Sequence, residues 1–398
     1  MERIRPHIGS SLIKILTGQR RVGKSYLLYQ IADEILASDP HADIVSINIA
    51  RDRFSLPIGT SRELYQHIVS SFTKEATTKV VMLDEVQELE GFEQCVAALF
   101  EQGGYDIYLT GSNSRLLSGD LASLLSGRYT TIEVFSLSYR EFLLFHAERE
   151  NEESLARYLR IGGLPYLGQL DKSSAEVLFS YFKTVEETIL LNDIIPTHKG
   201  SNKEFFRYLI RFLADTIGSP VSANSVAKYL KNQHFPLSVP SVLSFLETLQ
   251  KAYLVYKCEF SDISGKQLLD ISHKYYFGDL GIRNYLCGGY TLEDRAKVLE
   301  NAVYLSLLQK GYHVRTGRGF KDAEIDFVAT KGDAKAYIQV CESFGTQEKI
   351  EREFGNLLLP KDAYPRYMVT SDVSLDGMIQ DGVPIYSLRR WLLQTPLA

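Results

Sequence analysis

One eight-residue motif constrains the fold of this chain more than any other feature. Residues 18–25 read Gly-Gln-Arg-Arg-Val-Gly-Lys-Ser, which fits the pattern G-x-x-x-x-G-K-[ST] of phosphate-binding loops in full. An apolar stretch typical of a short strand, residues 12–16, precedes the motif, and apolar residues at helical spacing follow it over residues 26–36. A strand, a glycine-rich turn and a helix in this order predict an α/β fold built around an anion-binding loop.

The residue types of the motif indicate what it can hold. Its glycines let the backbone curl around an anion, so that successive N–H groups and the N-terminus of the next helix point at phosphate oxygens. We expect the Lys24 ammonium to reach the β- and γ-phosphates of a nucleotide and the Ser25 hydroxyl to ligate Mg²⁺. The expected nucleotide-binding residues are Gly18, Gln19, Arg20, Arg21, Val22, Gly23, Lys24, Ser25 and Tyr26.

Two carboxylates follow another apolar strand further along the chain. Residues 79–83 form the expected strand, and Asp84 and Glu85 come directly after it. Asp84 is placed to hold Mg²⁺, directly or through water, and Glu85 to polarise an attacking water as a general base. An apolar strand that ends in Asp-Glu is commonly no more than a strand end. On the same sheet as a phosphate-binding loop, however, the functional interpretation is favoured.

Two further polar positions are candidates for sensing the γ-phosphate. The next expected strand, residues 107–110, leads into Gly-Ser-Asn-Ser, where Ser112 and Asn113 lie beside the Asp-Glu strand. The alternative is a plain turn, because glycine, serine and asparagine all favour turns. Further on, Arg128 is a candidate arginine finger for the γ-phosphate of a neighbouring subunit, or else a solvated surface arginine. The expected catalytic residues are Glu85, Asn113 and Arg128.

The pattern of strands and helices changes along the 398 residues, which are enough for two or three domains. Strand-like stretches, among them an expected strand at residues 43–50, alternate with helix-like stretches at first, which predicts a parallel α/β sheet. Helical patterns then dominate, three short helices and a strand at residues 252–256 follow, and strands alternate with helices towards the end. We expect four regions: an α/β nucleotide domain at 1–145, a helical connector at 146–200, a middle domain at 201–290 and an α/β C-terminal domain at 291–398.

Composition excludes several classes of protein. Lys and Arg number 44 and Asp and Glu 49, so the formal net charge is −5 and a uniformly basic nucleic-acid coat is excluded. The four cysteines, Cys95, Cys258, Cys287 and Cys341, are widely spaced, which argues against a disulfide framework and a structural zinc site. The chain shows no apolar run of about 18 residues and no signal-peptide pattern. We therefore expect a cytoplasmic protein without a membrane segment.

Taken together, the motifs resemble a known family. The segments GQRRVGKS (18–25), VVMLDEVQEL (80–89), LTGSNS (109–114) and SGRY (126–129), with FSLSYREF, GGLP and LLNDI behind them, are similar to those of prokaryotic AAA-type ATPases that carry a C-terminal domain of unknown function. The resemblance covers nearly the whole chain. It implies ATP and Mg²⁺ as cofactors, Lys24 and Ser25 as nucleotide and Mg²⁺ residues, Asp84 and Glu85 as the hydrolytic pair, and Arg128 as a family-like arginine.

The middle region has the element order of a winged helix. Ser222 is an expected cap for a helix that ends near Lys231, and Pro240 lies in the first turn of a second helix. In such domains the second helix can enter a DNA major groove. Residues 241–250 hold no Arg or Lys, however, and phosphate contacts supply most of the nonspecific affinity. The region is therefore either a DNA-contacting module or a packing and assembly module.

The C-terminal region resembles the core of PD-(D/E)XK nucleases. In that core a helix Glu, a strand Asp and an (E/Q)xK strand converge on Mg²⁺, and Glu300, Asp326 and Gln339 match the first three places. The fourth place holds Cys341 instead of lysine, and the missing cation leads us to expect no DNA cleavage. The expected fold is therefore restriction-endonuclease-like, retained as a scaffold.

These features lead to one principal functional expectation and two alternatives. The principal expectation is an AAA-type ATPase whose Mg²⁺-dependent hydrolysis switches an interaction with DNA, through the middle and C-terminal domains, in a homo-oligomer. The first alternative is a nucleotide-gated signalling or scaffold protein with protein partners and slow turnover. The second alternative is an ATP-dependent nuclease.

Overall fold

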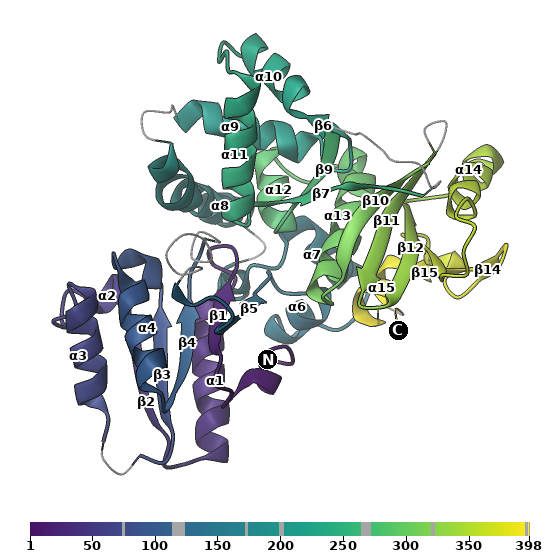
Figure 1. Ribbon diagram of the computed structural model, residues 1–398. Coiled ribbons are helices and arrows are strands. Elements are labelled where there is room, and N and C mark those ends of the chain that lie inside the picture. Colours follow the sequence, from purple (N-terminus) through teal and green to yellow (C-terminus); the bar gives the residue numbers. More distant parts are fainter. Residues whose placement is uncertain are drawn as a thin grey trace. The chain divides into compact units, whose positions relative to one another are not determined.

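The chain forms two compact units (Figure 1). The computed structural model describes residues 1–73, 76–113, 124–171, 174–198, 203–263, 272–319, 323–394 and 397. The first unit comprises Met1–Phe135 together with Lys251–Tyr253, and the second comprises Ser136–Gln250 and Leu254–Ala398. The short segment Lys251–Tyr253 thus packs with a unit that lies far from it in sequence.

A parallel sheet forms the centre of the first unit. Its five strands lie in the order β2-β3-β4-β1-β5, and every neighbouring pair is parallel. The strands are β1 (Ile13–Thr17), β2 (Asp43–Asn48), β3 (Lys79–Asp84), β4 (Tyr105–Thr110) and β5 (Tyr129–Glu133). Because the strands are parallel, all five carboxyl ends lie at one edge of the sheet, where ligands bind in open α/β sheets.

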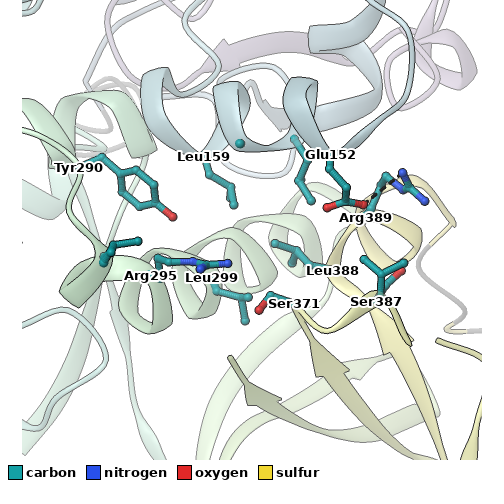
Figure 2. Close-up of a pocket in the computed structure, with 13 residues that line it drawn as sticks. Glu152, Leu159, Tyr290, Arg295, Leu299, Ser371, Ser387, Leu388 and Arg389 are labelled. Carbon is teal, nitrogen blue, oxygen red and sulfur yellow. Dashed lines mark ion pairs between the residues drawn. The ribbon is translucent and has the colours of Figure 1, made fainter. Parts of the chain in front are cut away.

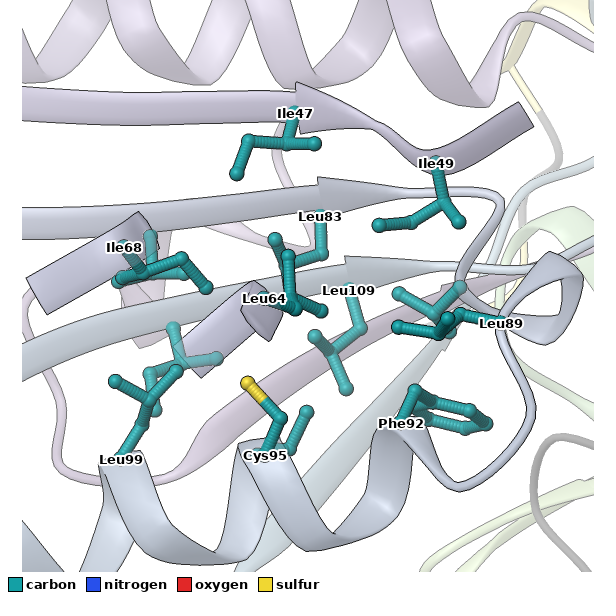
Figure 3. Close-up of a cluster of buried hydrophobic side chains, with 14 of the residues drawn as sticks. Ile47, Ile49, Leu64, Ile68, Leu83, Leu89, Phe92, Cys95, Leu99 and Leu109 are labelled. Atoms are coloured by element: carbon teal, nitrogen blue, oxygen red, sulfur yellow. The ribbon is translucent and has the colours of Figure 1, made fainter. Parts of the chain in front are cut away.

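Helices cover both faces of this sheet. The helix α1 (Lys24–Ser38) packs Leu28 and Ile31 against alternate strand residues such as Met82. On the opposite face, α3 (Ser61–Ser71) and α4 (Phe92–Gln102) pack against the remaining strand residues. Figure 3 shows this second cluster, in which Leu64 of α3 lies close to Leu83 of the sheet. The parallel α/β layering predicted from the sequence is confirmed.

Helices open the second unit, and two of them pack unusually closely. These helices are α6 (Tyr139–Phe145), α7 (Glu152–Ile161), α8 (Ala175–Ile189) and α12 (Leu280–Leu286), with a π-helical turn at Leu190–Ile194 after α8. A Cβ atom on Gly281 would lie 2.1 Å from the carbonyl oxygen of Ile161, so the backbones of α12 and α7 are in direct contact. The Asp279 carboxylate accepts the Gly163 N–H at 2.8 Å, which anchors the GGLP segment to the start of α12.

The middle of the chain forms a helical group with a small antiparallel sheet. The helices are α9 (Lys203–Asp215), α10 (Ala223–Asn232) and α11 (Val239–Lys251), and the sheet has the order β6-β9-β7 with strands Val221–Ser222, Ser272–Phe277 and Val255–Cys258. Ser222 caps α10 through a capping box with Ser225, as predicted.

A mixed sheet dominates the rest of the second unit. Its order is β14-β15-β13-β12-β11-β10-β8. Its strands are β8 (Phe260–Asp262), β10 (His313–Arg318), β11 (Glu324–Lys331), β12 (Ala334–Cys341), β13 (Arg366–Thr370), β14 (Ile379–Gln380) and β15 (Val383–Ser387). The accompanying helices are α13 (Arg295–Gln309), α14 (Gln347–Leu357) and α15 (Leu388–Gln394). Figure 1 shows α13 running beside the strands β10 and β11.

Two strand predictions needed correction. The strand expected at residues 43–50 ends at Asn48, because the Asn48 side chain accepts the Arg51 N–H and starts the short helix α2 (Ile49–Asp52). The strand expected at residues 252–256 begins only at Val255, because α11 extends to Lys251 and Tyr253 takes a left-handed backbone with φ 55°. In the described part of the chain, no helix is long and apolar enough to cross a membrane.

Candidate functional site

The phosphate-binding loop lies between β1 and α1 with the backbone that the motif requires. Gly18 and Gly23 have φ values of 139° and 99°, in a region that side chains rarely adopt. A Cβ atom on Gly18 would lie 2.1 Å from the carbonyl oxygen of Val134, so only glycine fits there. Arg21 also has a left-handed φ of 69°. The loop is thus a tight curl whose shape depends on its glycines.

Two polar side chains of the loop, those of Gln19 and Lys24, are buried within it. The Lys24 ammonium donates to the carbonyl oxygens of Gly18 and Gln19, at 2.9 Å in each case. The Gln19 side chain is only 2% exposed, and its amide nitrogen and oxygen have no hydrogen-bond partner among the described residues. A buried amide without a partner is costly, and an anion or its water shell in the curl would supply one. The loop therefore fits a bound nucleotide.

Asp84 lies at the same edge of the sheet, because it ends β3. Its two carboxylate oxygens accept hydrogen bonds from neighbouring strands: one from Asn48 Nδ2 at 2.6 Å and the other from the Thr110 hydroxyl. Asn48 ends β2 in register with Asp84, and Thr110 ends β4. These contacts fix the orientation of the carboxylate. Carboxylate and hydroxyl oxygens are ligands that Mg²⁺ prefers, so Asp84 and the half-buried Ser25 are the residues that would hold this ion.

Glu85 has an unusual backbone that aims its carboxylate. Its φ is 55°, a left-handed conformation that is uncommon outside glycine, and its N–H donates to the Thr110 hydroxyl at 3.0 Å. The carboxylate accepts a hydrogen bond from the Gln87 side-chain amide, whose nitrogen also lies 3.5 Å from the Ser112 hydroxyl. Gln87 thus joins the candidate base to the candidate γ-phosphate sensor.

Three residues of this site were missed by sequence reasoning. Asn48 and Thr110 orient Asp84, and Gln87 holds Glu85. The sequence held a signal for Asn48 and Thr110, because both are polar residues at the carboxyl ends of strands. Such residues lie close together when their parallel strands are neighbours in the sheet. Gln87 carried none, because its role depends on a left-handed residue two positions earlier.

The other predicted catalytic residues lie in different places. Asn113 is buried, and it follows Ser112 shortly after the end of β4. Ser114, the last residue of the LTGSNS segment, lies outside the described residues. Arg128 directly precedes β5, and its carbonyl oxygen accepts the N–H of Ile13 at the start of β1. It therefore lies at the sheet edge opposite the phosphate-binding loop. A phosphate contact by Arg128 would have to be made to another subunit.

Arg128 also has partners of its own in the first unit. Its guanidinium lies 3.7 Å from the Glu101 carboxylate and 5.4 Å from the centre of the Phe100 ring, and its side chain is 43% exposed. An exposed ion pair of this kind is weak, so these contacts leave the side chain free to be recruited. The role of arginine finger stays a prediction.

The C-terminal candidates come together only in part. Glu300 of α13 and Asp326 of β11 both lie against the Lys274 ammonium, at 3.1 and 3.8 Å. Gln339 of β12 accepts the N–H of Asp326 at 3.1 Å, but its amide nitrogen donates away from this cluster to Glu353, at 2.7 Å. In the described residues, no group of three or more His, Cys, Asp or Glu side chains is arranged to hold a metal ion.

A pocket of about 260 Å³ lies within the second unit (Figure 2), and all its lining residues belong to that unit. Two arginines line it, and both are paired with carboxylates. Arg389 lies 3.1 Å from Glu152, and Arg295 lies 3.3 Å from Glu342. Because these charges are already compensated, the pocket has less to offer a phosphorylated ligand than the loop of the first unit.

Comparison with known proteins agrees with this geometry. Residues 10–143 match the family of the AAA domain, and residues 152–293 match a domain of unknown function (DUF8612). An uncharacterized protein of Haemophilus influenzae is 33% identical to this chain, over 97% of the chain and 95% of that protein. The chain belongs to this family of AAA-domain proteins. An uncharacterized protein of Methanocaldococcus jannaschii is 27% identical, over 86% of the chain and 77% of that protein.

Solved structures give more distant likenesses to this AAA-domain protein. A Walker-type ATPase of Pyrococcus abyssi is 17% identical with a TM-score of 0.47, covering 69% of this chain and 90% of that one. The ORC1 protein of Aeropyrum pernix in complex with DNA is 11% identical with a TM-score of 0.29, covering 70% of this chain and 86% of that one. Likenesses this distant carry no functional conclusion.

Proposed function

We propose that this AAA-domain protein binds ATP with Mg²⁺, hydrolyses it, and uses the nucleotide state to switch an interaction with a partner. The observation that carries the proposal is the meeting of three features at one edge of the sheet: the Lys24 loop after β1, Asp84 at the end of β3, and Glu85 beside it. Anion binding, metal coordination and water activation need these groups on the same side of a nucleotide.

Each residue has a defined part in this proposal. The Lys24 ammonium leaves its two carbonyl partners for phosphate oxygens, and Ser25 and Asp84 would hold the Mg²⁺ ion. When bound, Mg²⁺ supplies positive charge at the phosphate oxygens. Glu85 accepts a proton from the attacking water through a carboxylate oxygen, and Gln87 orients that carboxylate.

Lys24→Ala tests nucleotide binding directly. We expect this variant to lose ATP binding, because the ammonium is the charge that the loop places at the phosphates. The matched control is Lys79→Ala, at the start of β3 and hence at the opposite edge of the sheet. Calorimetric titration with Mg-ATP measures both affinities, and the unfolding midpoint in nucleotide-free buffer shows that each variant is folded. Wild-type affinity in folded Lys24→Ala would rule out the assignment of the loop.

DNA is the partner class that we propose for the switch. The order α9-β6-α10-α11-β7-β9 supports a winged-helix-like module, and Lys228 and Lys231 are exposed on α10. The exposed positions of α11 carry Pro240, Leu243, Ser244 and Glu247 instead. Contacts from α10 would reach backbone phosphates, which position a protein on DNA without reading its sequence.

A second candidate function, a nucleotide-gated scaffold for a protein partner, is favoured by the surface of α11. Leu243 is 54% exposed there, and the exposed residues of this helix include no Lys or Arg. Fluorescence anisotropy with a duplex of about 30 base pairs, in ATP, ADP and no nucleotide, separates the two. Affinity that changes with nucleotide and falls in Lys228→Ala/Lys231→Ala supports DNA. Equal and negligible affinity in all three states, with no stimulation of ATP turnover by DNA, supports the scaffold.

A further inference from the structure

A buried lysine lies among the carboxylates of the second unit. Lys274 of β9 is 1% exposed. Its ammonium lies 2.7 Å from Glu324 Oε1, 3.1 Å from Glu300 Oε1 and 3.8 Å from Asp326 Oδ1. Glu324 and Asp326 both belong to β11, and Glu300 belongs to α13. One ammonium therefore joins a strand of the small sheet, a strand of the mixed sheet and a helix.

Two of the three carboxylates, those of Glu300 and Asp326, receive further hydrogen bonds from the protein itself. The Tyr276 hydroxyl donates to Glu300 Oε1 at 2.6 Å, and the N–H of Val340 donates to Asp326 Oδ2 at 2.8 Å. The other oxygen of Glu300 lies against Gly218, where a Cβ atom would be 2.7 Å away. Both carboxylates are thus bound by protein donors, as buried charges require.

The electrostatics of the cluster depend on the ammonium. Burial opposes protonation of Lys274, but Glu300, Asp326 and Glu324 outweigh burial and raise the pKa of this lysine above its usual value. Burial is the largest cause that raises the pKa of Asp326 well above its ordinary range, and repulsion from Glu300 is the second. Attraction to Lys274 lowers this pKa but does not outweigh them. Removing the ammonium would leave three carboxyl groups facing one another.

We infer that the Lys274 ammonium is the resident cation of this cluster and takes the place that a divalent metal would need. Mg²⁺ and Mn²⁺ bind oxygen ligands at about 2.0–2.2 Å, and a second cation in the same small volume would be repelled by the ammonium. The cluster therefore holds the second unit together and does not support metal-dependent cleavage of nucleic acid. This inference does not depend on the proposed ATPase function.

Manganese binding to Lys274→Met tests the inference, because methionine keeps the length of the side chain and removes its charge. We expect wild type in nucleotide-free buffer to show no change of unfolding midpoint with millimolar Mn²⁺. We expect the variant to melt lower without metal, to recover part of that loss with Mn²⁺, and to bind Mn²⁺ at least 10-fold more tightly than wild type. Adding Asp326→Asn to the variant should remove the gain. The matched control is Lys257→Met, on the neighbouring strand β7 and paired with Glu259.

The wild-type protein alone can overturn the inference. Mn²⁺ binding by wild type that Asp326→Asn abolishes, measured by electron paramagnetic resonance of free Mn²⁺, would show that the metal displaces the ammonium. DNA cleavage that requires Mn²⁺ and disappears in Asp326→Ala would also overturn the inference. If Lys274→Met does not fold, these two measurements on wild type still decide the question.

Discussion

At the scale of single residues, the nucleotide site depends on a few side chains whose orientation is set by neighbours. Asp84 is held by Asn48 and Thr110, and Glu85 by Gln87. The left-handed backbone of Glu85 costs on the order of 1–3 kcal/mol in a non-glycine residue. Such strain persists only where contacts with the surrounding structure hold the residue in place. The strain and the Gln87 contact both support our proposal that Glu85 acts as the base.

Replacing Glu85 by glutamine should separate binding from hydrolysis. We expect Glu85→Gln to keep ATP affinity within about 2-fold and to lower turnover by about 100-fold or more, because the amide keeps the shape but cannot accept a proton. Phosphate release under saturating Mg-ATP measures the effect. The matched control is Glu88→Gln, an exposed glutamate in the same turn, which should retain full turnover. Hydrolysis at the wild-type rate in Glu85→Gln would mean that another group is the base.

At the scale of elements, one buried arginine ties together three helices of the second unit. Arg283 of α12 is fully buried, and its Nε donates to the Ala214 carbonyl oxygen of α9 at 3.0 Å. Its Nη2 donates at 2.6 Å to Asp294, which directly precedes α13. Burial opposes ionisation of Asp294, but hydrogen bonds from Arg283 and Thr291 outweigh burial and lower the pKa of the carboxyl.

Removing this carboxylate should destabilise the fold in a pH-dependent way. We expect Asp294→Asn to lower the free energy of unfolding by about 3 kcal/mol at pH 7, because it leaves a buried guanidinium unpaired. Since the folded pKa lies below the unfolded one, the stabilisation is complete above the unfolded pKa of about 3.9 and is lost as the pH falls through the folded value. The difference from wild type should therefore shrink below about pH 4.

Urea unfolding at a series of pH values measures that difference. The control is Asp333→Asn, at an exposed carboxylate in the turn between β11 and β12. Its stability should match that of wild type at every pH. A constant gap between Asp294→Asn and wild type down to pH 3 would contradict the role of the charge.

At the scale of the whole molecule, the position of Arg128 bears on assembly. It precedes β5 and therefore lies at the edge of the sheet opposite the phosphate-binding loop of its own subunit. Strand β5 has five residues, and at about 3.3 Å per residue the two edges are separated by more than an arginine side chain can span. An arginine finger at this position requires a second copy of the chain.

Arg128→Ala should therefore lower turnover without weakening ATP binding. We expect a loss of about 1,000-fold if the guanidinium stabilises the transition state of a neighbour, and we expect wild-type turnover to rise faster than linearly with protein concentration. Steady-state rates over a range of concentrations, with calorimetry for affinity, test both. The control is Arg62→Ala, an exposed arginine of α3. Linear turnover that is insensitive to Arg128→Ala would exclude both the finger and the oligomer.

The sequence by itself determined the phosphate-binding loop, the strand before Asp84 and Glu85, and the helices that follow the loop and Ser222. These features are local: the glycines, the lysine and the apolar spacing act over a few residues, so their pattern is readable without the fold. The resemblance to AAA-type ATPases rested on the same contiguous segments and is confirmed for the AAA domain.

The tertiary structure alone decided which distant side chains meet. Asn48 and Thr110 reach Asp84 because the register of β2, β3 and β4 aligns their ends. Lys274, to which no sequence motif assigns a role, enters the carboxylate cluster because its side chain reaches Glu300 of α13 and Glu324 of β11. The polar residues at these strand ends are readable in the sequence, but the strand order and helix packing that bring them together depend on contacts between residues far apart in the chain.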